Sequence, residues 1–510
     1  MPPPAWPCRD ADHLLVSGAQ MVELEEQLFA SGLPVEALME KAALAVSRRL
    51  LAHPQELSAG ALVLVGPGHN GGDALVVARE LHLAGVPVRI WCPFEQLKPL
   101  GERHRAHGRW LGIPELAAPP DPGDSALWID GIFGIGQRRP PGDLIEGLLA
   151  ERHRQRPGRL MAIDVPSGLC ADSGRCLGQA AARAVRTYCI GLIKQGLVQD
   201  PALAHVGVLE RIDLALPPAL LASLPPEQPI GLHPADAALG PWPAPDPAAG
   251  KYGRGRLLVV AGSARYRGAA HLALGGAAAA GCGSLQALVP EVVAEGLWQV
   301  RPEVVLPADP LGAASLSRLD AVLLGPGLGP TDPDGAAWRE AWARLQGFGG
   351  LLVLDADGLN ALARLGAAAW LAGRAGPTWL TPHRGELARL FPELAPLPAL
   401  EAAAAASACS GAVVLLKGAR TVVAAPDGRR WQLLWAWPGA AQAGLGDVLA
   451  GYAAALGGLA MAAEASADAR LLALAALHHG LAGVGDGGPM GVARRLARRA
   501  WSDSTGRIGA

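Results

Sequence analysis

Short, continuous apolar runs alternate with helical patterns along the first half of this chain. The run Ala61–Gly66 (ALVLVG) is typical of a strand that is covered on both faces. Runs of the same type follow at Val86–Cys92, Ala126–Phe133, Arg159–Pro166, Ala184–Gly191 and Gly207–Leu214. Helical patterns precede or separate them at Met21–Ala30, Val35–His53, Ala74–Ala84 and Asp143–Gln155. Because strands at this spacing pair in parallel, the pattern predicts a mostly parallel sheet wrapped by helices.

A proline-dense segment divides the chain. It contains PPALLASLPPEQP and GPWPAPDP, and proline at this density cannot continue a helix or an inner strand. The alternation then restarts, with strands predicted at Gly255–Ala261, Ser284–Val289, Ala321–Gly325, Leu351–Ala356 and Ala412–Lys417, and helices at Ala269–Cys282, Asp447–Leu459 and Ala469–Ala482. We therefore predict an N-terminal domain over residues 1–215, a linker over 216–230 and a second α/β domain over 231–510, which suits a length of 510 residues.

Composition excludes several broad classes of protein. A formal net charge of −2 offers no broad reason to bind nucleic acid or an anionic membrane. Seven cysteines without a CxxC pair argue against a disulfide framework or a zinc module. Met1–Gly18 lacks the apolar core of a signal peptide. The Ala- and Gly-rich stretch Ala269–Val289 suits a buried helix and strand better than a bilayer span. We expect a soluble, cytoplasmic protein.

Three polar loops of the first half follow predicted strands. The first is glycine-rich and runs from Gly66 to Asp73, where glycines and a helix start would allow close approach to an anion. Asp130 and Asp164 stand at the ends of two further strands, and Ser167 follows in the segment LMAIDVPSG. A strand-to-helix turn capped by Asp73 would produce the same first loop. The carboxyl ends of parallel strands meet at one edge, so we expect all three loops to line one crevice.

These loops carry a family resemblance. GPGHNGGDALVVA, IDGIFGIG, IDVPSGL and IKQGL, in this order, resemble the NAD(P)H-hydrate epimerase domain, the YjeF N-terminal family, over roughly residues 15–214. That family acts on NADH or NADPH whose nicotinamide ring has been hydrated, and it interconverts the R and S epimers. The resemblance implies a Rossmann-like three-layer sandwich. The family usually reads NNGGDG, where this chain has His69 and Ala74 in place of an Asn and a Gly.

The resemblance also implies residue roles. Asp164 would contact the hydrated ring as acid–base residue. Asn70, Asp130 and Ser167 would hold a potassium ion, and oxygen donors of this kind suit a hard cation. The ligand site would be lined by His69, Asn70, Gly71, Gly72 and Asp73 and by Gly134, Ile135, Gly136, Gln137, Arg138, Arg139 and Pro140.

The segment Trp437–Gly458 is the strongest candidate for a catalytic site in the second half. Small residues lead into Asp447 and an apolar helix, whose first backbone N–H groups could hold a phosphoryl group in transfer. Asp447 could take the proton from the attacking hydroxyl. A glycine turn capped by Asp447 would have the same sequence. Two further strand-end segments, Lys417–Thr421 and LTPHRGELARL with His383, favour the chemical interpretation.

Together with LDADGLN, LLGPGLG and KYGRGRLLVVAGSARYRGAA, these segments resemble the ribokinase-like NAD(P)H-hydrate dehydratases over about residues 233–483. In that family a nucleotide phosphorylates the ring hydroxyl of the S hydrate, and loss of phosphate restores NAD(P)H; bacterial-type members use ADP and yield AMP. The resemblance implies that Asp447 is the base and that a magnesium ion accompanies the nucleotide. Hydrate contacts would come from Ala269, Gly327, His383 and Asp447, and nucleotide contacts from Lys417, Gly418, Ala419, Arg420, Thr421 and Gly446.

The second half departs from its family at the anion hole. The family pattern is typically NPGxATGGTGDVL, and here Trp437, Gln442, Ala443 and Leu445 replace Asn, Thr, Gly and Thr. These changes keep the backbone donors but remove side-chain support. Trp431, Trp435 and Trp437 alternate as in a strand, which predicts core or hairpin packing.

The sequence as a whole predicts a bifunctional enzyme, an isomerase joined to an ADP-dependent lyase, that repairs NADH hydrate and NADPH hydrate. We expect small-molecule substrates (both hydrates and ADP), no nucleic-acid or membrane partner, and a homo-oligomer. The alternative is a ribokinase-like small-molecule kinase fused to a non-catalytic Rossmann-like binding module. It would phosphorylate another alcohol and would not exchange epimers.

Overall fold

The computed structural model describes residues 6–243, 248–329 and 336–505. The chain divides into an N-terminal unit, Arg9–Gln228, and a C-terminal unit that begins at Pro229 and also takes in residues 6–8. Residues 6–8 were expected in the first domain, but the Trp6 indole Nε1 donates to the Asp236 carbonyl at 2.9 Å. The expected linker is packed rather than free, since the Gln228 side chain donates to the Leu15 carbonyl at 2.5 Å.

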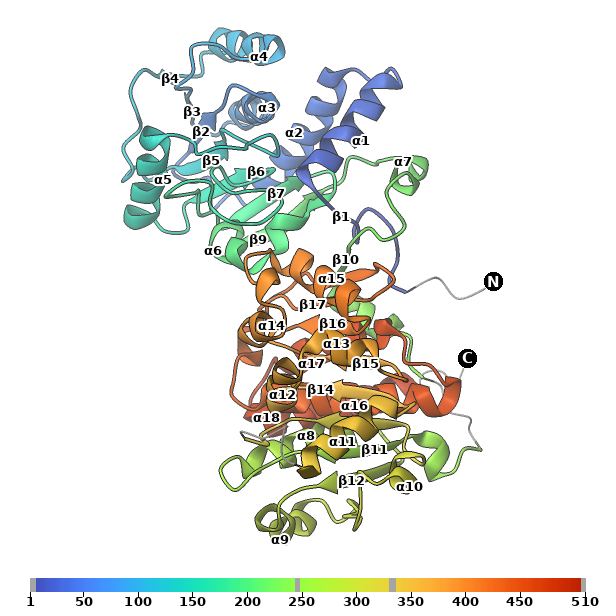
Figure 1. Ribbon diagram of the computed structural model, residues 1–510. Coiled ribbons are helices and arrows are strands. Elements are labelled where there is room, and N and C mark those ends of the chain that lie inside the picture. Colours follow the sequence, from blue (N-terminus) through green and yellow to red (C-terminus); the bar gives the residue numbers. More distant parts are fainter. Residues whose placement is uncertain (1–5, 244–247, 330–335, 506–510) are drawn as a thin grey trace. The chain divides into compact units, whose positions relative to one another are not determined.

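The N-terminal unit is built on a seven-stranded sheet in which every pair is parallel, in the order β4-β3-β2-β5-β6-β7-β9 (Figure 1). A separate parallel pair joins β1 (Leu15–Val16) and β8 (Ile193–Lys194). The sheet strands are β2 (Ala61–Val65), β3 (Val88–Trp91), β4 (Glu115–Leu116), β5 (Leu127–Gly131), β6 (Leu160–Ile163), β7 (Arg186–Ile190) and β9 (Val208–Ile212).

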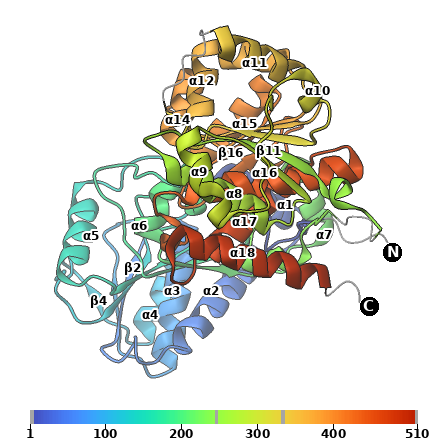
Figure 2. The same cartoon turned by 90° about the horizontal axis from the view of Figure 1, so that it is seen from below.

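Helices cover both faces of this sheet. They are α1 (Gly18–Ala30), α2 (Val35–Leu51), α3 (His69–Leu83), α4 (Pro99–Trp110), α5 (Asp143–Gln155), α6 (Leu203–Val206) and α7 (Pro218–Ala222). Leu148 and Leu149 of α5 pack on one face against Leu62 and Trp128. Figure 2 shows α2, α3 and α4 together on the other side. The result is a three-layer arrangement, as expected from the continuous apolar strands.

The C-terminal unit contains a nine-stranded sheet in the order β10-β18-β17-β16-β15-β14-β13-β11-β12. Only β17 pairs antiparallel, with β16 and β18. The strands are β10 (Ile230–Leu232), β11 (Arg256–Val260), β12 (Ser284–Leu288), β13 (Ala321–Leu324), β14 (Leu351–Leu354), β15 (Thr378–Leu380), β16 (Val413–Leu416), β17 (Val422–Ala424) and β18 (Arg430–Leu433). The predicted α/β class with mostly parallel sheets is therefore confirmed in both units.

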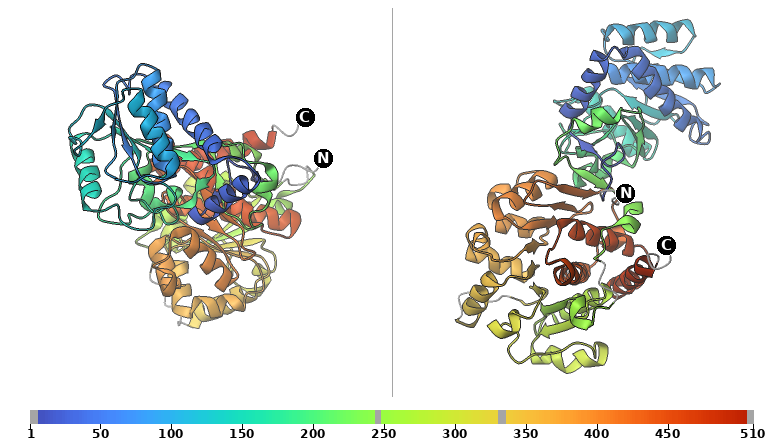
Figure 3. Two further views of the ribbon diagram at one scale, coloured as in Figure 1. Left: turned by 90° about the horizontal axis from the view of Figure 1, so that it is seen from above. Right: turned by 90° about the vertical axis from the view of Figure 1, so that its right-hand side faces the viewer.

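Two helical layers enclose the second sheet (Figures 2 and 3). One layer holds α8 (Arg267–Ala279), α16 (Leu445–Glu464), α17 (Ala469–Ala482) and α18 (Gly488–Thr505). The other holds α11 (Ala336–Gly347), α12 (Asp357–Leu365), α13 (Ala367–Ala372), α14 (Arg384–Leu390) and α15 (Ala399–Ser410). The short helices α9 (Glu291–Val300) and α10 (Ala313–Leu316) complete the unit.

Within the described ranges, α16 alone is long and apolar enough to span a membrane by length and composition. However, 78% of its most apolar stretch is buried inside the unit. Its small residues pack tightly on α8, since a Cβ at Gly451 would lie 1.8 Å from the Ala273 carbonyl oxygen. A core helix of a globular domain has this same composition.

Some elements differ from the predictions. Helix α3 begins at His69, five residues before the predicted start, so the expected loop is largely its first turn. Gly71 makes this possible, because a Cβ there would lie 1.9 Å from the Gly66 carbonyl oxygen. The predicted tryptophan strand ends at Leu433, and Trp435 is 54% exposed rather than packed.

Candidate functional site

Each unit brings predicted residues together at the carboxyl ends of its strands. In the N-terminal unit Asp130 is the fourth residue of β5 and is fully buried. Its carboxylate accepts from Ser167 twice, from the hydroxyl at 2.7 Å and from the backbone N–H at 2.8 Å. Burial raises the pKa of Asp130 to about 6, against these hydrogen bonds, which lower it. The Ser167 hydroxyl in turn accepts from the Phe133 backbone N–H at 3.0 Å, which ties the two loops together.

Asn70 joins the same arrangement from the first turn of α3. Its side-chain amide donates to the carbonyls of Phe133 at 3.0 Å and Ile163 at 3.3 Å. Its Oδ1 atom is buried and has no hydrogen-bond partner among the described residues. Gly134 packs closely against both Asn70 and Asp164, since a Cβ at Gly134 would be 3.3 Å from the Asn70 side chain and 2.8 Å from Asp164 Oδ2. The three predicted cation ligands are therefore linked through Phe133.

Asp164 forms a buried ion pair with Lys194. The Lys194 Nζ lies 2.5 Å from Asp164 Oδ1 and 2.5 Å from the Ile190 carbonyl, and the lysine side chain is 1% exposed. Burial by itself lowers the pKa of Lys194, but the Asp164 carboxylate raises it above its usual value. The other carboxylate oxygen accepts from the Ile135 backbone N–H at 3.2 Å. Asp164 has a φ of +64°, an uncommon conformation that costs backbone energy and is typical of functional positions.

Two more acids belong to this region. Glu25 of α1 and Asp73 of α3 line one pocket together with His69. Burial raises the pKa of Glu25 to about 7, with Lys194 lowering it and Asp164 raising it. Burial also raises the pKa of Asp73 well above its usual value, as do the charges of Asp164 and Glu25. Three carboxyl groups and one ammonium group are thus close enough to influence one another.

The rest of the predicted ligand loop lies near the surface. The Gln137 side chain accepts from the Gly168 N–H at 2.8 Å and so still contacts the site. Arg138 instead reaches Asp172, with 3.2 Å between the charged groups. The predicted residues Gly136, Arg138, Arg139 and Pro140 are exposed.

The C-terminal unit has its own acid and lysine pair. Asp355 follows β14, is 1% exposed, and accepts hydrogen bonds from Lys417 Nζ and from the Thr381 hydroxyl, the latter at 2.9 Å. The next residue, Ala356, has a φ of +47°, an energetically costly conformation for alanine. Asp355 was not among the predicted site residues, although its motif was recognised.

Asp447 stands in the first turn of α16, beside this pair. Burial, together with the charge of Asp355, raises the pKa of Asp447 to about 7, although Lys417 lowers it. The Lys417 ammonium group reaches the same turn, since a Cβ at Gly446 would lie 3.4 Å from Nζ. Backbone N–H groups in a first helical turn have no intrahelical acceptor. Asp447, Lys417 and the amide groups of Gly446 and Asp447 therefore meet at one place, whereas the Leu445 and Val448 N–H groups donate to the carbonyls of Gln442 and Gly444.

Leu445 is the first residue of this turn, and its side chain is buried, with 2% exposed. The preceding Gly444 has a φ of +87°, which glycine adopts without strain. Relative to the threonine that the family pattern has here, Leu445 lacks a hydroxyl group.

The other predicted residues of this unit surround the same strand ends. Ala269 and Gly327 touch, because a Cβ at Gly327 would lie 2.5 Å from the Ala269 Cβ. His383 caps α14, where its Nδ1 accepts from the Gly385 N–H at 3.0 Å. Lys417 lies beside it, with its N–H bonded to the Pro382 carbonyl at 2.8 Å. The predicted nucleotide residues Gly418, Ala419, Arg420 and Thr421 form the turn between β16 and β17.

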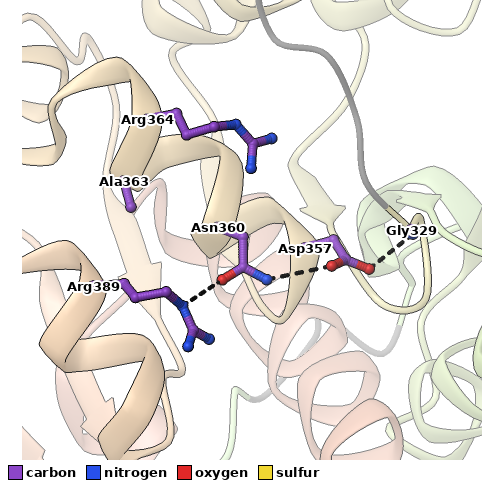
Figure 4. Close-up of a pocket in the computed structure, with 6 residues that line it drawn as sticks. All are labelled: Gly329, Asp357, Asn360, Ala363, Arg364 and Arg389. Carbon is purple, nitrogen blue, oxygen red and sulfur yellow. Dashed lines mark hydrogen bonds between the residues drawn. The ribbon is translucent and has the colours of Figure 1, made fainter.

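A further pocket opens next to this site (Figure 4). The Gly329 N–H donates to Asp357 Oδ2 at 2.8 Å, and the Asn360 amide donates to Asp357 Oδ1 at 3.3 Å. Arg389 Nε donates to Asn360 Oδ1 at 2.9 Å and completes the chain of hydrogen bonds. The negative charge of Asp357 also raises the pKa of Asp447, which places the pocket beside that carboxyl.

Two family models match the chain in order. The N-terminal model, described as YjeF-related protein N-terminus, covers residues 35–196, and the model for NAD(P)H-hydrate dehydratase covers residues 257–485. The bifunctional NAD(P)H-hydrate repair enzyme Nnr of Gloeobacter violaceus is 44% identical over 87% of this chain and 88% of its own length. The enzyme of that name from Synechocystis sp. is 41% identical over 92% of this chain and 90% of its own length.

Among solved structures, a ribokinase-like superfamily protein from Enterococcus faecalis V583 aligns with 55% of this chain and 99% of its own, at 20% identity and a TM-score of 0.48. The family assignment rests on the two ordered models and on relatives that match along most of both chains. On these grounds the chain belongs to the family of bifunctional NAD(P)H-hydrate repair enzymes.

Proposed function

We propose that the N-terminal unit interconverts the R and S hydrates of NADH and NADPH and that the C-terminal unit dehydrates the S hydrate with ADP. The observation that carries this proposal is that each unit holds an acid beside a lysine at its strand ends: Asp164 with the buried Lys194, and Asp447 and Asp355 with the partly buried Lys417. Both epimers can be salvaged only if one is converted into the other. The homo-oligomeric state and the cytoplasmic location expected from the sequence stay predictions.

In the C-terminal unit Asp447 takes the proton of the ring hydroxyl, whose oxygen attacks the terminal phosphorus of ADP. AMP leaves, and the phosphorylated hydrate then loses phosphate and a ring proton to restore NAD(P)H. The backbone amides of the first turn of α16 and the Lys417 ammonium group stabilise the phosphoryl oxygens in transfer. Asp355 holds the Lys417 ammonium group in place by accepting a hydrogen bond from it. A magnesium ion carried by ADP would neutralise phosphate charge.

The experiment that tests this function supplies the purified protein with S hydrate, ADP and Mg²⁺. We expect the absorbance of reduced nicotinamide to return, with one AMP and one phosphate formed for each NAD(P)H. Phosphorylation of another alcohol without such a return would instead support the small-molecule kinase.

The residues that would hold potassium fit such an ion. Asn70 Oδ1 is buried and has no hydrogen-bond partner among the described residues, and Asp130 and Ser167 offer further oxygens nearby. Carboxylate, hydroxyl and amide oxygens are ligands for hard cations. When bound, the ion would supply positive charge to the loop that carries Gly134, next to Asp164.

Potassium should therefore affect both stability and activity of the N-terminal unit. Raising K⁺ to a hundred times its dissociation constant should stabilise the unit by about 2.7 kcal/mol relative to tetramethylammonium at equal ionic strength. Thermal denaturation in the two salts measures this, and epimer exchange should be faster in K⁺. Asn70→Ala should lose both effects. Equal melting and equal rates in the two salts would contradict the site.

The pKa of Asp447 predicts how dehydration depends on pH. A base must be ionised, so a pKa of about 7 predicts that the rate falls about tenfold for each pH unit below this value. Asp355→Asn removes a negative charge that raises the pKa of Asp447 and frees Lys417 to lower it. The acid limb of the variant should shift to lower pH, with a smaller maximal rate.

The matched control for this experiment is Asp427→Asn, which changes a carboxylate that is 52% exposed. It should leave the pH profile unchanged. An acid limb at the same pH in Asp355→Asn and in the wild type would show that Asp355 does not act on Asp447.

A further inference from the structure

The pocket of the N-terminal unit holds a carboxyl group for which the family resemblance implies no role. Glu25 lies on the inner side of α1, between the buried residues Met21 and Leu24 and the pocket. Its neighbours Glu23 and Glu26 are exposed. Among the described residues Glu25 forms no hydrogen bond or ion pair, so its charge is not matched by a direct partner. A half-buried acid that lines a pocket and has no partner of its own is available to a ligand.

The surroundings of Glu25 connect it to the candidate catalytic pair. Across the pocket stand Asp73 and His69 of α3, and Phe29, Leu38 and Ile190 form an apolar wall. Ile190 also accepts from Lys194 Nζ through its carbonyl at 2.5 Å, so the pocket adjoins the ion pair. The two acids differ in their contacts. Asp164 is in direct contact with Lys194, whereas Glu25 has no such contact and burial raises its pKa to about 7.

We propose that Glu25 is a second acid–base residue of the epimerase site, exchanging a proton with the hydrate on the face that Asp164 does not serve. This inference rests on the epimerase function proposed above. Inversion of a hydroxylated carbon needs departure of oxygen from one face and its addition on the other, so each face needs a proton-handling group. Two carboxyl groups, Glu25 in the pocket and Asp164 on the lysine that contacts the pocket wall, meet that need.

The step balances with water as the only co-reactant. The hydroxylated carbon of the hydrate is bonded to the ring nitrogen, so the nitrogen lone pair can drive the hydroxyl out. Glu25 gives its proton to that hydroxyl, the carbon–oxygen bond breaks, and water leaves a carbon–nitrogen double bond. Another water adds from the opposite face and gives its proton to Asp164. In the reverse direction Asp164 is the donor and Glu25 the acceptor.

The test compares Glu25→Gln with Glu26→Gln, which changes an exposed acid on the same helix. The full chain allows ADP-dependent dehydration of the S hydrate to be measured in the same preparation as a control for folding. We expect Glu25→Gln to lower the rate of epimer exchange about a hundredfold with a small change in KM. Dehydration should be unchanged, and Glu26→Gln should match the wild type in both assays.

Labelled water provides a second measurement. In water enriched in heavy oxygen, every inverted hydrate should carry the label on its hydroxylated carbon, and unlabelled inverted product would overturn the step. Exchange by Glu25→Gln within twofold of an active wild type would overturn the role of Glu25 alone. If the wild type exchanges epimers no faster than buffer does, the epimerase function fails and this inference fails with it.

Discussion

Asp447→Asn is expected to slow ADP-dependent dehydration by a hundredfold or more, because a positioned general base contributes at least about that factor. Asn cannot accept the proton of the ring hydroxyl, yet it keeps the size and polarity of the side chain at the start of α16. The backbone amides of that turn and Lys417 are unchanged, so the dissociation constant for ADP should change little.

The loss of charge at a helix start has a smaller effect that must be separated from catalysis. An acid in a first turn stabilises a helix by about 0.3–1 kcal/mol. Asp468→Asn is the matched control, because Asp468 caps α17 and accepts from the Arg470 N–H at 2.8 Å. It should show a similar small loss of stability and full turnover. Near-normal turnover in Asp447→Asn would mean that this acid merely begins a helix.

Asp164→Asn is expected to abolish epimer exchange and also to destabilise the N-terminal unit. Lys194 is 1% exposed, so removing its carboxylate partner leaves a buried, uncompensated charge. Breaking such a pair costs about 3–5 kcal/mol. Chemical denaturation measures this loss, and dehydration by the same protein reports whether the C-terminal unit remains folded.

The double variant Asp164→Asn with Lys194→Met separates the two effects. It removes both charges, so most of the stability should return, whereas epimer exchange should stay at least about a hundredfold below the wild type. Recovery of exchange together with stability would show that the pair is structural. Exchange at the wild-type rate in Asp164→Asn would contradict the catalytic role directly.

The strands were predictable from the sequence because buried strands are short, continuous runs of apolar residues. All six predicted runs of the first half contain a strand. Strands β2, β5 and β6 are buried at every residue, as strands covered on both faces are, whereas β9 at the sheet edge is only partly buried. Helix α4 was not predicted, because it lies at the surface with Trp110 79% exposed and shows little apolar periodicity. The early start of α3 was missed because glycines disfavour helix, whereas here they allow the helix to approach the strands.

The candidate sites were predictable only where a motif marks them. Asp164, Asn70 and Asp447 stand in glycine-rich segments that a reader can recognise. Lys194 and Asp355 also lie in motifs, but their partners are 30 and 62 residues away, and only the folded sheet brings them together. Glu25 lies on an ordinary amphipathic helix among other acids. Nothing in its local sequence distinguishes it from Glu23 or Glu26.

The central claim is that one chain carries both activities, and an equal mixture of R and S hydrates tests it most directly. With excess ADP and Mg²⁺ the wild type should return the whole mixture to NAD(P)H, without a slow second phase at the spontaneous rate of epimer exchange. Asp164→Asn should return half of the mixture quickly and the remainder only at that spontaneous rate. A wild type that shows the same fast and slow phases as this variant would contradict the account.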